Sequence, residues 1–574
     1  MFSALAATNP GLIVVALGAL IGLTPWGYGR KGLALAAPLV AIAVILGGEF
    51  GVTGRLSLLG LELETYRLDR LSFLFGLIFA IAAFLNAIYA LHERDRVPDA
   101  MGVIYAGSAI GAAFAGDLIS LFVFWELTAI SSVFLVWAGR TEAARKAGLR
   151  YLAIHVSSGV LLLAGAVMIY DQTGTIAFNA IGLDAGLGGL LIFLAFGIKC
   201  AFPFLHNWLQ DAYPKASVTG TVMLSAFTTK LAVYALARGF PGEETLIWIG
   251  AVMTVFPVFF AVVENDLRRV LAYSLNNQLG FMVCGVGLGT ALSINGAAAH
   301  AFVHILYKAL LFMSMGAVLH RTGTAKASEL GGLFRSMPMT TVFCVIGAAS
   351  ISAFPLFSGF VAKAMVLAEA ADQHRWIVWG MLVFASAGVL EHSGIKIPFF
   401  AFFAHDSGRR VSEAPWNMLL AMGLAAGLCL LLGWPWGGYG LLYALLPFPE
   451  AAYAPYTWDH VVAQMQLLVA AMFAFAVLMR FGLYPPEKPG VILDSDWTYR
   501  FVGVRVARWS AAIAAQLAVR LKQAFRRGMS VWDRRLHAVF SPAGALARAT
   551  PSSAAAIWTA AILALVLIAS FLAS

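Results

Sequence analysis

The sequence predicts an all-α polytopic membrane protein with about 14–16 transmembrane helices. Hydrophobic residues make up 61% of its 574 residues and charged residues only 12%, about half the charged fraction of a soluble chain. The mean hydropathy is +0.83. Apolar stretches of about 20 residues, long enough to cross a bilayer as a helix, recur along the chain. Examples are residues 12–42, 71–91, 101–137, 152–170 and 555–572.

The charges of the connecting loops predict the orientation of the chain. No basic residue precedes the first apolar run and no small-residue cleavage site follows it, so we expect a retained helix rather than a signal peptide. By the positive-inside rule, the basic connections lie in the cytoplasm of a bacterial cell and the N-terminus lies outside its inner membrane. The basic connections contain Arg30, Lys31, residues 140–150, Arg268, Arg269, Arg409 and Arg410, and the connections between them contain Asp171, Asp184, Glu243 and Glu244.

The C-terminal residues 498–540 predict an amphipathic helix on the cytoplasmic surface, followed by a last span. Apolar and basic side chains alternate there at helical spacing. Such a helix would anchor the chain at the lipid interface or clamp a neighbouring subunit. The net charge of +9 follows from this segment and the basic loops, so no nucleic-acid partner is expected. The Pro-rich stretches 447–459 and 484–490 are expected to be loops.

The four cysteines predict no metal or redox chemistry. Cys200, Cys284, Cys344 and Cys429 stand singly in apolar segments, with no CxxC pair and no His/Cys metal spacing. We expect reduced packing residues, and neither a metal site nor a cofactor.

Five charged side chains interrupt apolar stretches that are long enough to span the membrane. They are Glu126, Lys199, Lys230, Lys308 and Lys363. One ionised group at the centre of a membrane helix costs about 2.5–3.5 kcal/mol on insertion scales, so several such groups must face a polar interior. A line of titratable groups inside a membrane domain predicts an ion path.

Glu126 and Lys199 have no opposite charge near them in sequence, so each is expected to be satisfied by meeting the other across the helix bundle. Making or breaking such a pair changes whether the lysine holds a proton. Lys230 is expected to belong to the same line, although a lysine near a helix end could instead extend to the interface.

His300, His304 and Lys308 follow one another at spacings of four residues and therefore share one helix face. Two such histidines could bind a metal or haem, but no third ligand or carboxylate stands nearby, so a proton relay is the better interpretation. Lys363 would extend the relay. Glu391, His392 and Lys396 would form a further, secondary exit, or would simply mark a helix end.

An Ala-Phe-Pro triplet appears twice in mid-membrane segments, at Pro203 and at Pro355, the second with Gly359 close behind. A proline removes a backbone hydrogen bond, a loss tolerated where a broken helix lines a hydrated cavity. Two such breaks, each near a buried lysine, predict a transporter built from repeated halves.

Several strings together resemble the proton-translocating antiporter-like subunits of respiratory complex I, membrane-bound hydrogenases and Mrp-type cation/proton antiporters. The resemblance covers roughly residues 65 to 370, and with the C-terminal string 484–497 it is greatest to the D subunits of Mrp-type Na⁺/H⁺ antiporters. The strings are Phe124-Trp125-Glu126-Leu127, Lys199 with Phe202-Pro203 and 206–212, 224–236, 266–274 with Gln278-Leu279-Gly280, and 304–312.

The resemblance implies about fourteen helices that contain two inverted five-helix repeats. We therefore expect N-terminal helices over 1–98, repeats over 99–240 and 241–405, and C-terminal helices over 406–574. It also implies that Glu126 and Lys199 form the ion pair of a first half-channel, that Lys230 connects it to the histidines, and that Lys363 ends the second. Lys215, Thr219, Asn276 and Asn277 depart from the usual family pattern, as does the stretch 391–400.

The function implied by the resemblance is proton transport in a multisubunit Na⁺ or K⁺/proton antiporter, with other membrane subunits, protons, monovalent cations and the lipid bilayer as partners. One alternative is a proton-pumping membrane subunit of an NADH dehydrogenase or hydrogenase. Another is a membrane scaffold of an inorganic-carbon uptake system, in which the buried charges would carry no current.

Overall fold

The computed structural model describes residues 8–25, 27–58, 60–490, 492–544 and 552–573. The chain divides into two compact units, Met1–Ile492 and Leu493–Ser574. Eleven helices in the described residues are long and apolar enough to cross a membrane, and three more apolar helices are shorter. The all-α polytopic class is therefore confirmed, and the protein is a multi-pass membrane protein.

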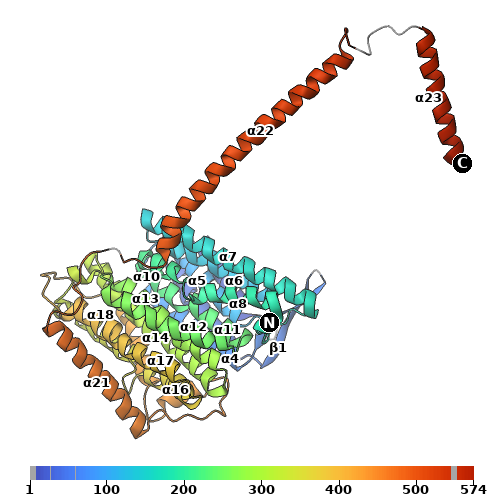
Figure 1. The fold of residues 1–574 in the computed structure, drawn as a ribbon. Helices are drawn as coiled ribbons and strands as arrows, with labels where there is room; N and C mark the ends of the chain where they lie inside the picture. Colours follow the sequence, from blue (N-terminus) through green and yellow to red (C-terminus); the bar gives the residue numbers. More distant parts are fainter. Residues whose placement is uncertain (1–7, 26, 59, 491, 545–551, 574) are drawn as a thin grey trace. The chain divides into compact units, whose positions relative to one another are not determined.

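The described part of the first unit begins with four helices and a hairpin (Figure 1). These elements are α2 (Pro10–Leu23), α3 (Gly27–Leu46), β1 (Gly51–Leu58), β2 (Leu61–Leu68), α4 (Arg70–Tyr89) and α5 (Arg96–Ala113). The antiparallel hairpin was not predicted. Its alternating charged residues suit a strand outside the membrane, and its second strand is fixed to the loop after α5 because the Arg67 N–H donates to Phe114 O at 2.8 Å.

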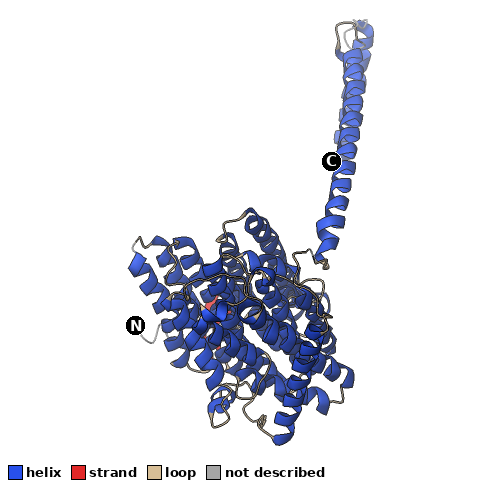
Figure 2. Ribbon diagram, turned by 90° about the vertical axis from the view of Figure 1, so that its left-hand side faces the viewer, coloured by secondary structure: helices blue, strands red, loops and turns tan. Residues whose placement is uncertain are grey.

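Two helical groups follow, and their helices pack against one another (Figures 1 and 2). The first contains α6 (Leu118–Trp137), α7 (Glu142–Thr173), α8 (Gly186–Cys200), α9 (Asn207–Ala212), α10 (Val218–Ala226) and α11 (Thr228–Gly239). The second contains α12 (Glu244–Val263), α13 (Leu267–Leu288), α14 (Ala291–Thr322), α15 (Pro338–Ile351), α16 (Ser358–Asp372) and α17 (Trp376–Val389). A π-helical segment η5 (Leu390–Ile395), the short α18 (Lys396–Pro398) and a second π-helical segment η6 (Phe399–Phe403) continue α17.

The first unit ends with α19 (Trp416–Leu431), α20 (Gly438–Tyr443) and α21 (Trp458–Arg480). The second unit contains α22 (Val504–Phe540), a 37-residue helix that mixes apolar and basic residues as the sequence predicted, and α23 (Ser552–Ala573), which is long and apolar enough to span a membrane.

The two helical groups share local features at equal spacing in the sequence. Asp117 caps α6 and Asp266 caps α13, and each forms an isolated bridge to the loop after the next helix. Those next helices, α7 and α14, are both 32 residues long and both end in a Thr-Gly-Thr sequence, at Thr173 and at Thr322. Each of these threonine hydroxyls donates to the carbonyl four residues before it. These matches support the expected internal repeat, whose boundaries stay a prediction.

Both Ala-Phe-Pro triplets break a helix in the same way. The chain leaves α8 at Ala201 and α15 at Ala353, which have left-handed φ angles of 61° and 57°. Three residues later Phe204 and Leu356 are left-handed again, with φ of 66° and 76°. Left-handed non-glycine residues cost energy and persist only where the surroundings impose them, so the two breaks are fixed features of the fold.

Helix α14 lies at the centre of the first unit. It packs against α4, α10, α13, α15, α16 and α19. Within its most apolar window 94% of the residues are buried, compared with 39% for α7. The histidines and the lysine of the predicted relay therefore lie in the interior of the protein and away from lipid.

Candidate functional site

Lys199 lies at the end of α8, just before the first helix break, and is fully buried. Its Nζ donates to the Trp125 carbonyl at 2.5 Å and to Thr128 Oγ1 at 2.7 Å, and it lies 4.3 Å from the centroid of the Trp125 ring. The lysine is thus held on α6 by two oxygens and an aromatic face, which is how a buried ammonium is stabilised without a carboxylate in contact.

Glu126 follows Trp125 on α6, and its carboxylate lies against α7. A Cβ added to Gly159 would lie 1.5 Å from Glu126 Oε1, so the absence of a side chain at Gly159 makes room for the carboxylate. Oε1 is buried and has no hydrogen-bond partner among the described residues. Glu126 and Lys199 interact electrostatically, but their charged atoms lie against different neighbours. The predicted contact pair remains a prediction.

Lys230 is fully buried, so it does not extend to the membrane surface. It lies in the first turn of α11, after a break between α10 and α11 at Phe227, and its Nζ donates to the Ser225 carbonyl at 2.7 Å. The break frees that carbonyl from the helix. Lys230 is also an electrostatic neighbour of Cys200 and of the histidines of α14, so it lies between the first helical group and the predicted relay.

His300 belongs to a closed hydrogen-bonded triangle inside the bundle. Its Nε2 lies 3.2 Å from Gln278 Oε1 of α13 and 3.0 Å from the Tyr307 hydroxyl, which in turn donates to Gln278 Oε1 at 3.1 Å. The ring centroids of His300 and His304 are 6.1 Å apart, too far for a direct hydrogen bond between them.

His304 and Lys308 are fully buried, and neither the two His304 nitrogens nor Lys308 Nζ has a hydrogen-bond partner in the described part of the chain. Nearly all buried polar groups in proteins are hydrogen-bonded, to protein or to water. Groups left without a protein partner at the centre of a membrane domain are suited to hydration and to proton exchange.

Lys363 lies beside the second helix break. Its Nζ donates to the Ile351 carbonyl at 2.6 Å and lies 5.3 Å from the Phe281 ring centroid. Gly359, in the first turn of α16, approaches the end of α15 so closely that an added Cβ would lie 1.8 Å from the Ser350 carbonyl oxygen. The break and this glycine therefore place Lys363 against the freed carbonyls of α15.

His392 and Lys396 lie in and after the π-helical segment η5, and both are fully buried. His392 Nδ1 contacts Ser393 Oγ at 2.9 Å, while its Nε2 has no partner among the described residues. Lys308, Lys363 and Lys396 all interact electrostatically with His392. Glu391 is only half-buried, and its Oε1 is unpartnered in the described chain.

The sequence interpretation missed a buried histidine in the first helical group. His155 of α7 is fully buried, neither ring nitrogen has a hydrogen-bond partner among the described residues, and it is an electrostatic neighbour of Lys199. Its ring centroid lies 4.1 Å from that of Tyr151 and 4.4 Å from that of Trp208. The spacing that relates Thr173 to Thr322 also relates His155 to His304, and that repeat signal could have found it.

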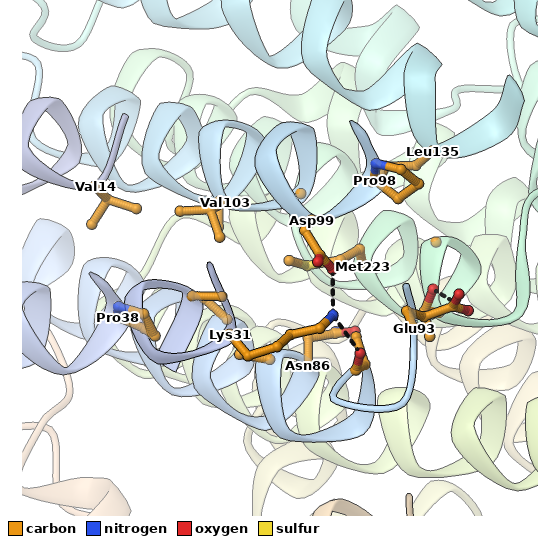
Figure 3. A pocket seen from close by; sticks show the side chains of 18 residues that line it. Val14, Lys31, Pro38, Asn86, Glu93, Pro98, Asp99, Val103, Leu135 and Met223 are labelled. Carbon is orange, nitrogen blue, oxygen red and sulfur yellow. Dashed lines mark hydrogen bonds and ion pairs between the residues drawn. The ribbon is translucent and has the colours of Figure 1, made fainter. Parts of the chain in front are cut away.

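A polar opening lies on the side of the basic loops, between α3, α4, α5 and α10 (Figure 3). The pocket has a volume of about 40 Å³, enough for water, and most of its lining behind the polar side chains is apolar. Lys31 reaches from α3 to Asp99 of α5 at 2.7 Å, and the Thr219 hydroxyl donates to Glu93 Oε1 at 3.5 Å. Lys31, Asp99, Glu93 and Thr219 line the opening, so Thr219, a departure from the family pattern, borders it.

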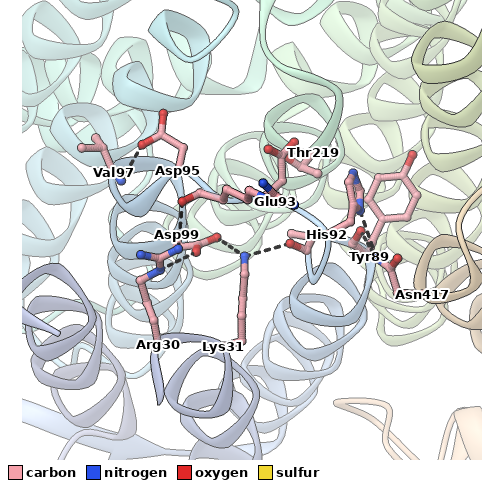
Figure 4. A network of polar contacts seen from close by, with 12 residues as sticks. Arg30, Lys31, Tyr89, His92, Glu93, Asp95, Val97, Asp99, Thr219 and Asn417 are labelled. Carbon is pink, nitrogen blue, oxygen red and sulfur yellow. Dashed lines mark hydrogen bonds and ion pairs between the residues drawn. The ribbon is translucent and has the colours of Figure 1, made fainter. Parts of the chain in front are cut away.

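His92 joins this polar network (Figure 4). Its Nδ1 lies 3.0 Å from Asn417 Nδ2, and its ring packs on His320 with centroids 5.1 Å apart. Burial, aided by the positive charges of His320 and Lys31, lowers the pKa of His92 to about 4. At neutral pH His92 is therefore an uncharged acceptor in this network.

Ten titratable groups inside the first unit, which we call the buried line, form two sets of electrostatic neighbours. The first set is the half-buried Glu126 with His155 and Lys199, and the second is Lys230, His300, His304, Lys308, Lys363, His392 and Lys396. Cys200, which follows Lys199, is an electrostatic neighbour of Lys230 and lies between the two sets. The described part of the chain contains no cluster of three or more His, Cys, Asp or Glu side chains that could hold a metal ion.

A family model described as NADH:quinone oxidoreductase/Mrp antiporter, TM, matches residues 115–388. That range contains the groups from Glu126 to Lys363 and ends before Glu391. The Na⁺/H⁺ antiporter D subunit of Alkalihalophilus pseudofirmus is 32% identical over 52% of this chain and 64% of its own length. The NADH-quinone oxidoreductase N subunit of Desulforudis audaxviator is 31% identical over 54% of this chain and 68% of its own length.

The fold is similar to that of a chain in the Mrp complex from Dietzia sp. DQ12-45-1b. The TM-score is 0.66 at 24% sequence identity, and the similarity covers 81% of this chain and 99% of the other. The chain spans between a third and two thirds of the length of the curated relatives that it matches first.

Proposed function

Because the chain belongs to the membrane-subunit family of NADH:quinone oxidoreductases and Mrp antiporters, we propose that it carries protons in a multisubunit Na⁺ or K⁺/proton antiporter. The observation that carries the proposal is the line of buried titratable groups from Glu126 to Lys396. Each such group costs free energy when it is placed inside a membrane. Because the fold keeps so many of them close together, we infer that they have a function.

In the proposed mechanism, protons enter the first helical group near Lys199 and Glu126. Proton transfer to or from Lys199 changes its attraction to Glu126, and the two charges move together or apart. Lys230 then transfers a proton to His304 and His300, whose rings can each accept and release one. Lys308 and Lys363 receive the proton from the histidines. Water links groups that are too far apart for direct contact.

The opening lined by Glu93 and Thr219 supplies the route from the cytoplasm. It lies on the face with the basic loops, which the positive-inside rule assigns to the cytoplasm of a bacterial cell, with the N-terminus outside. Met223 of α10 lines the inner part of the cavity, one turn before the break that carries Lys230. A proton from bulk water would therefore approach the buried line through the polar side chains at the mouth and a small cavity that has room for water.

Other membrane subunits would complete the antiporter complex, and the path of the cation would lie in those subunits. The proton gradient would drive cation export, since the chain carries no nucleotide-binding or redox motif of its own. The Desulforudis relative favours one alternative, a proton-pumping subunit of an oxidoreductase, in which electron transfer elsewhere drives the same line. A scaffold without proton transport is the remaining alternative.

The test is cation-dependent proton movement in inverted membrane vesicles that contain the whole complex. We expect addition of Na⁺ or K⁺ to collapse a preformed pH gradient in the absence of any electron donor. Proton movement that requires NADH or hydrogen and ignores the cation would instead assign the chain to a redox complex. A complex that moves protons under neither condition would favour the scaffold.

A further inference from the structure

Glu487 follows α21 in the Pro-rich stretch that the sequence assigned to a loop, yet its carboxylate reaches the buried lysine of α18. Lys396 Nζ lies 2.9 Å from Glu487 Oε1, and the two side chains are 0% and 8% exposed. An ion pair this well buried is costly unless its surroundings stabilise both charges. The groups that surround Lys396 therefore indicate whether the pair stabilises the fold or transfers a proton.

Lys396 has all the acceptors it needs without Glu487. Its Nζ donates to the carbonyls of Val262 at 2.6 Å and Glu264 at 2.7 Å, and reaches that of Ala261 at 3.3 Å. These oxygens belong to the C-terminal end of α12, where free carbonyls carry partial negative charge. An ammonium has three N–H bonds, so a lysine that only capped α12 would be satisfied by the three carbonyls. The carboxylate of Glu487 is a fourth acceptor competing for the same protons.

On its inner side, Lys396 continues the buried line. His392 lies one turn before it, with a free Nε2 in the described structure and with Lys308 and Lys363 as electrostatic neighbours. Ser393, held between His392 and Ser274 by contacts of 2.9 and 2.7 Å, fixes the orientation of the ring. His392 is thus the group through which Lys396 communicates with the relay of α14.

On the side away from His392, Glu487 borders a surface pocket of about 350 Å³ whose lining also includes Tyr484, Ser328 and His405. Ser328 is bonded to Asn265, so the pocket lies on the face of the connection between α12 and α13. Glu487 Oε2 has no hydrogen-bond partner among the described residues. One carboxylate oxygen therefore contacts the buried lysine, and the other is buried beside the pocket without a protein partner in the described structure.

We infer that Glu487 is a proton-transfer group that connects Lys396 to water, and that the segment around it forms a second port of the proton line. The inference rests on the proposed proton transport. In the step from Lys396 toward the pocket, an N–H bond of the Lys396 ammonium breaks and an O–H bond forms on Glu487, which leaves a neutral pair. The O–H bond then breaks as the proton passes to water, and Lys396 is recharged from the side of His392.

The groups around the pair fit this role. Glu391 and His392 of η5 face it, as do Tyr484 of the same segment and Glu264, which lies 3.5 Å from Arg269. Burial holds the pKa of Glu487 above its usual range, against the opposing effect of Lys396. A carboxylate whose pKa is raised toward neutrality takes up a proton more readily than an exposed one.

The test uses the whole complex in inverted vesicles and compares Glu487→Gln and Glu487→Asp with Lys488→Gln. Lys488 is the adjacent residue and is exposed, so it controls for changes in the segment itself. We expect Glu487→Gln to lower cation-dependent proton flux by about tenfold or more, since a positioned proton-transfer group contributes at least that much. Glu487→Asp should retain much of the flux, and Lys488→Gln all of it.

A small weak acid separates proton transfer from a structural role. Formate can carry a proton through the pocket in place of the missing carboxylate, so it should restore flux in Glu487→Ala, whose short side chain leaves room for it, over the formate leak of vesicles that lack the complex. Wild-type flux in Glu487→Gln, or a loss in Glu487→Ala that formate does not restore, would overturn the inference. If Glu126→Gln abolishes flux while Glu487→Gln has no effect, only this inference fails; if the wild type shows no flux, the proposed function fails with it.

Discussion

The carboxylate of Glu126 occupies the space that a side chain on Gly159 would need. The two residues lie on neighbouring helices, and an added Cβ at Gly159 would come within 1.5 Å of Glu126 Oε1. Glu126 therefore owes its position to a glycine 33 residues later in the chain, whose role is visible only in the structure. This relationship makes the position of the Glu126 carboxylate, a proposed proton carrier, testable without removing it.

Gly159→Ala should impair proton flux while the protein still assembles. The added methyl group meets the flexible end of a glutamate, which can rotate away, so the helix packing survives but the carboxylate moves relative to Lys199. We expect a several-fold loss of cation-dependent proton flux in vesicles. Gly427→Ala in α19 is the control, because an added Cβ there meets nothing within 4 Å. Unchanged flux in Gly159→Ala would mean that the position of the Glu126 carboxylate does not matter.

His155→Asn should lower proton flux if the buried histidine of α7 belongs to the line. His155 lies among Tyr151, Trp208 and Lys199 with both ring nitrogens free of partners in the described chain. We expect about a tenfold loss. His374→Asn is the control, since His374 is exposed and has a left-handed φ of 55° that asparagine tolerates. Equal flux in the two variants would assign His155 to packing alone.

Gly359→Ala should destabilise the protein itself. The added Cβ would lie 1.8 Å from the backbone oxygen of Ser350, which cannot rotate away as a side chain can. We expect a loss of about 1–3 kcal/mol or more, measured as a lower unfolding temperature of the purified protein in detergent. Gly380→Ala in α17, where an added Cβ meets nothing within 4 Å, should not lower it. An unchanged unfolding temperature in Gly359→Ala would show that the second break relaxes easily.

The stability of the protein should fall as the pH is lowered through the range in which His92 titrates. Burial lowers the pKa of His92 to about 4 from its ordinary 6.5. Between these values the unfolded chain binds a proton that the folded chain does not, so stability is full above about pH 6.5 and falls toward about pH 4. His92→Asn should show a shallower fall in unfolding temperature than the wild type or His374→Asn. A slope as steep as that of the wild type would exclude His92 as a contributor.

The class of fold and most of the site follow from local sequence. Composition and the length of the apolar runs predict the helices. A charged residue within an apolar run, such as Glu126 or Lys363, is itself the signal for a candidate site residue. The two Ala-Phe-Pro triplets mark two breaks because proline cannot continue a helix. The third break, at Phe227, has neither proline nor glycine at the point of interruption, so no local signal predicts it.

The features that the sequence does not predict depend on contacts between distant residues. The π-helical turns around Lys396 and the approach of Glu487 to that lysine arise from packing across a long stretch of chain. The hairpin 51–68 was overlooked because its charged, alternating residues give no membrane signal. His155 was overlooked because a single histidine in an apolar helix is unremarkable until its repeat partner, His304, is aligned with it.

The most direct test of the account is proton flux in inverted vesicles that contain the complete complex with Glu126→Gln or Lys199→Ala, compared with the exposed matched variants Glu62→Gln and Lys146→Ala. Assembly is checked first by the amount of complex in the membrane. We predict that cation-dependent flux is lost in both buried variants and kept in both exposed ones. Full flux in assembled Glu126→Gln and Lys199→Ala complexes would contradict the claim that protons follow the buried line.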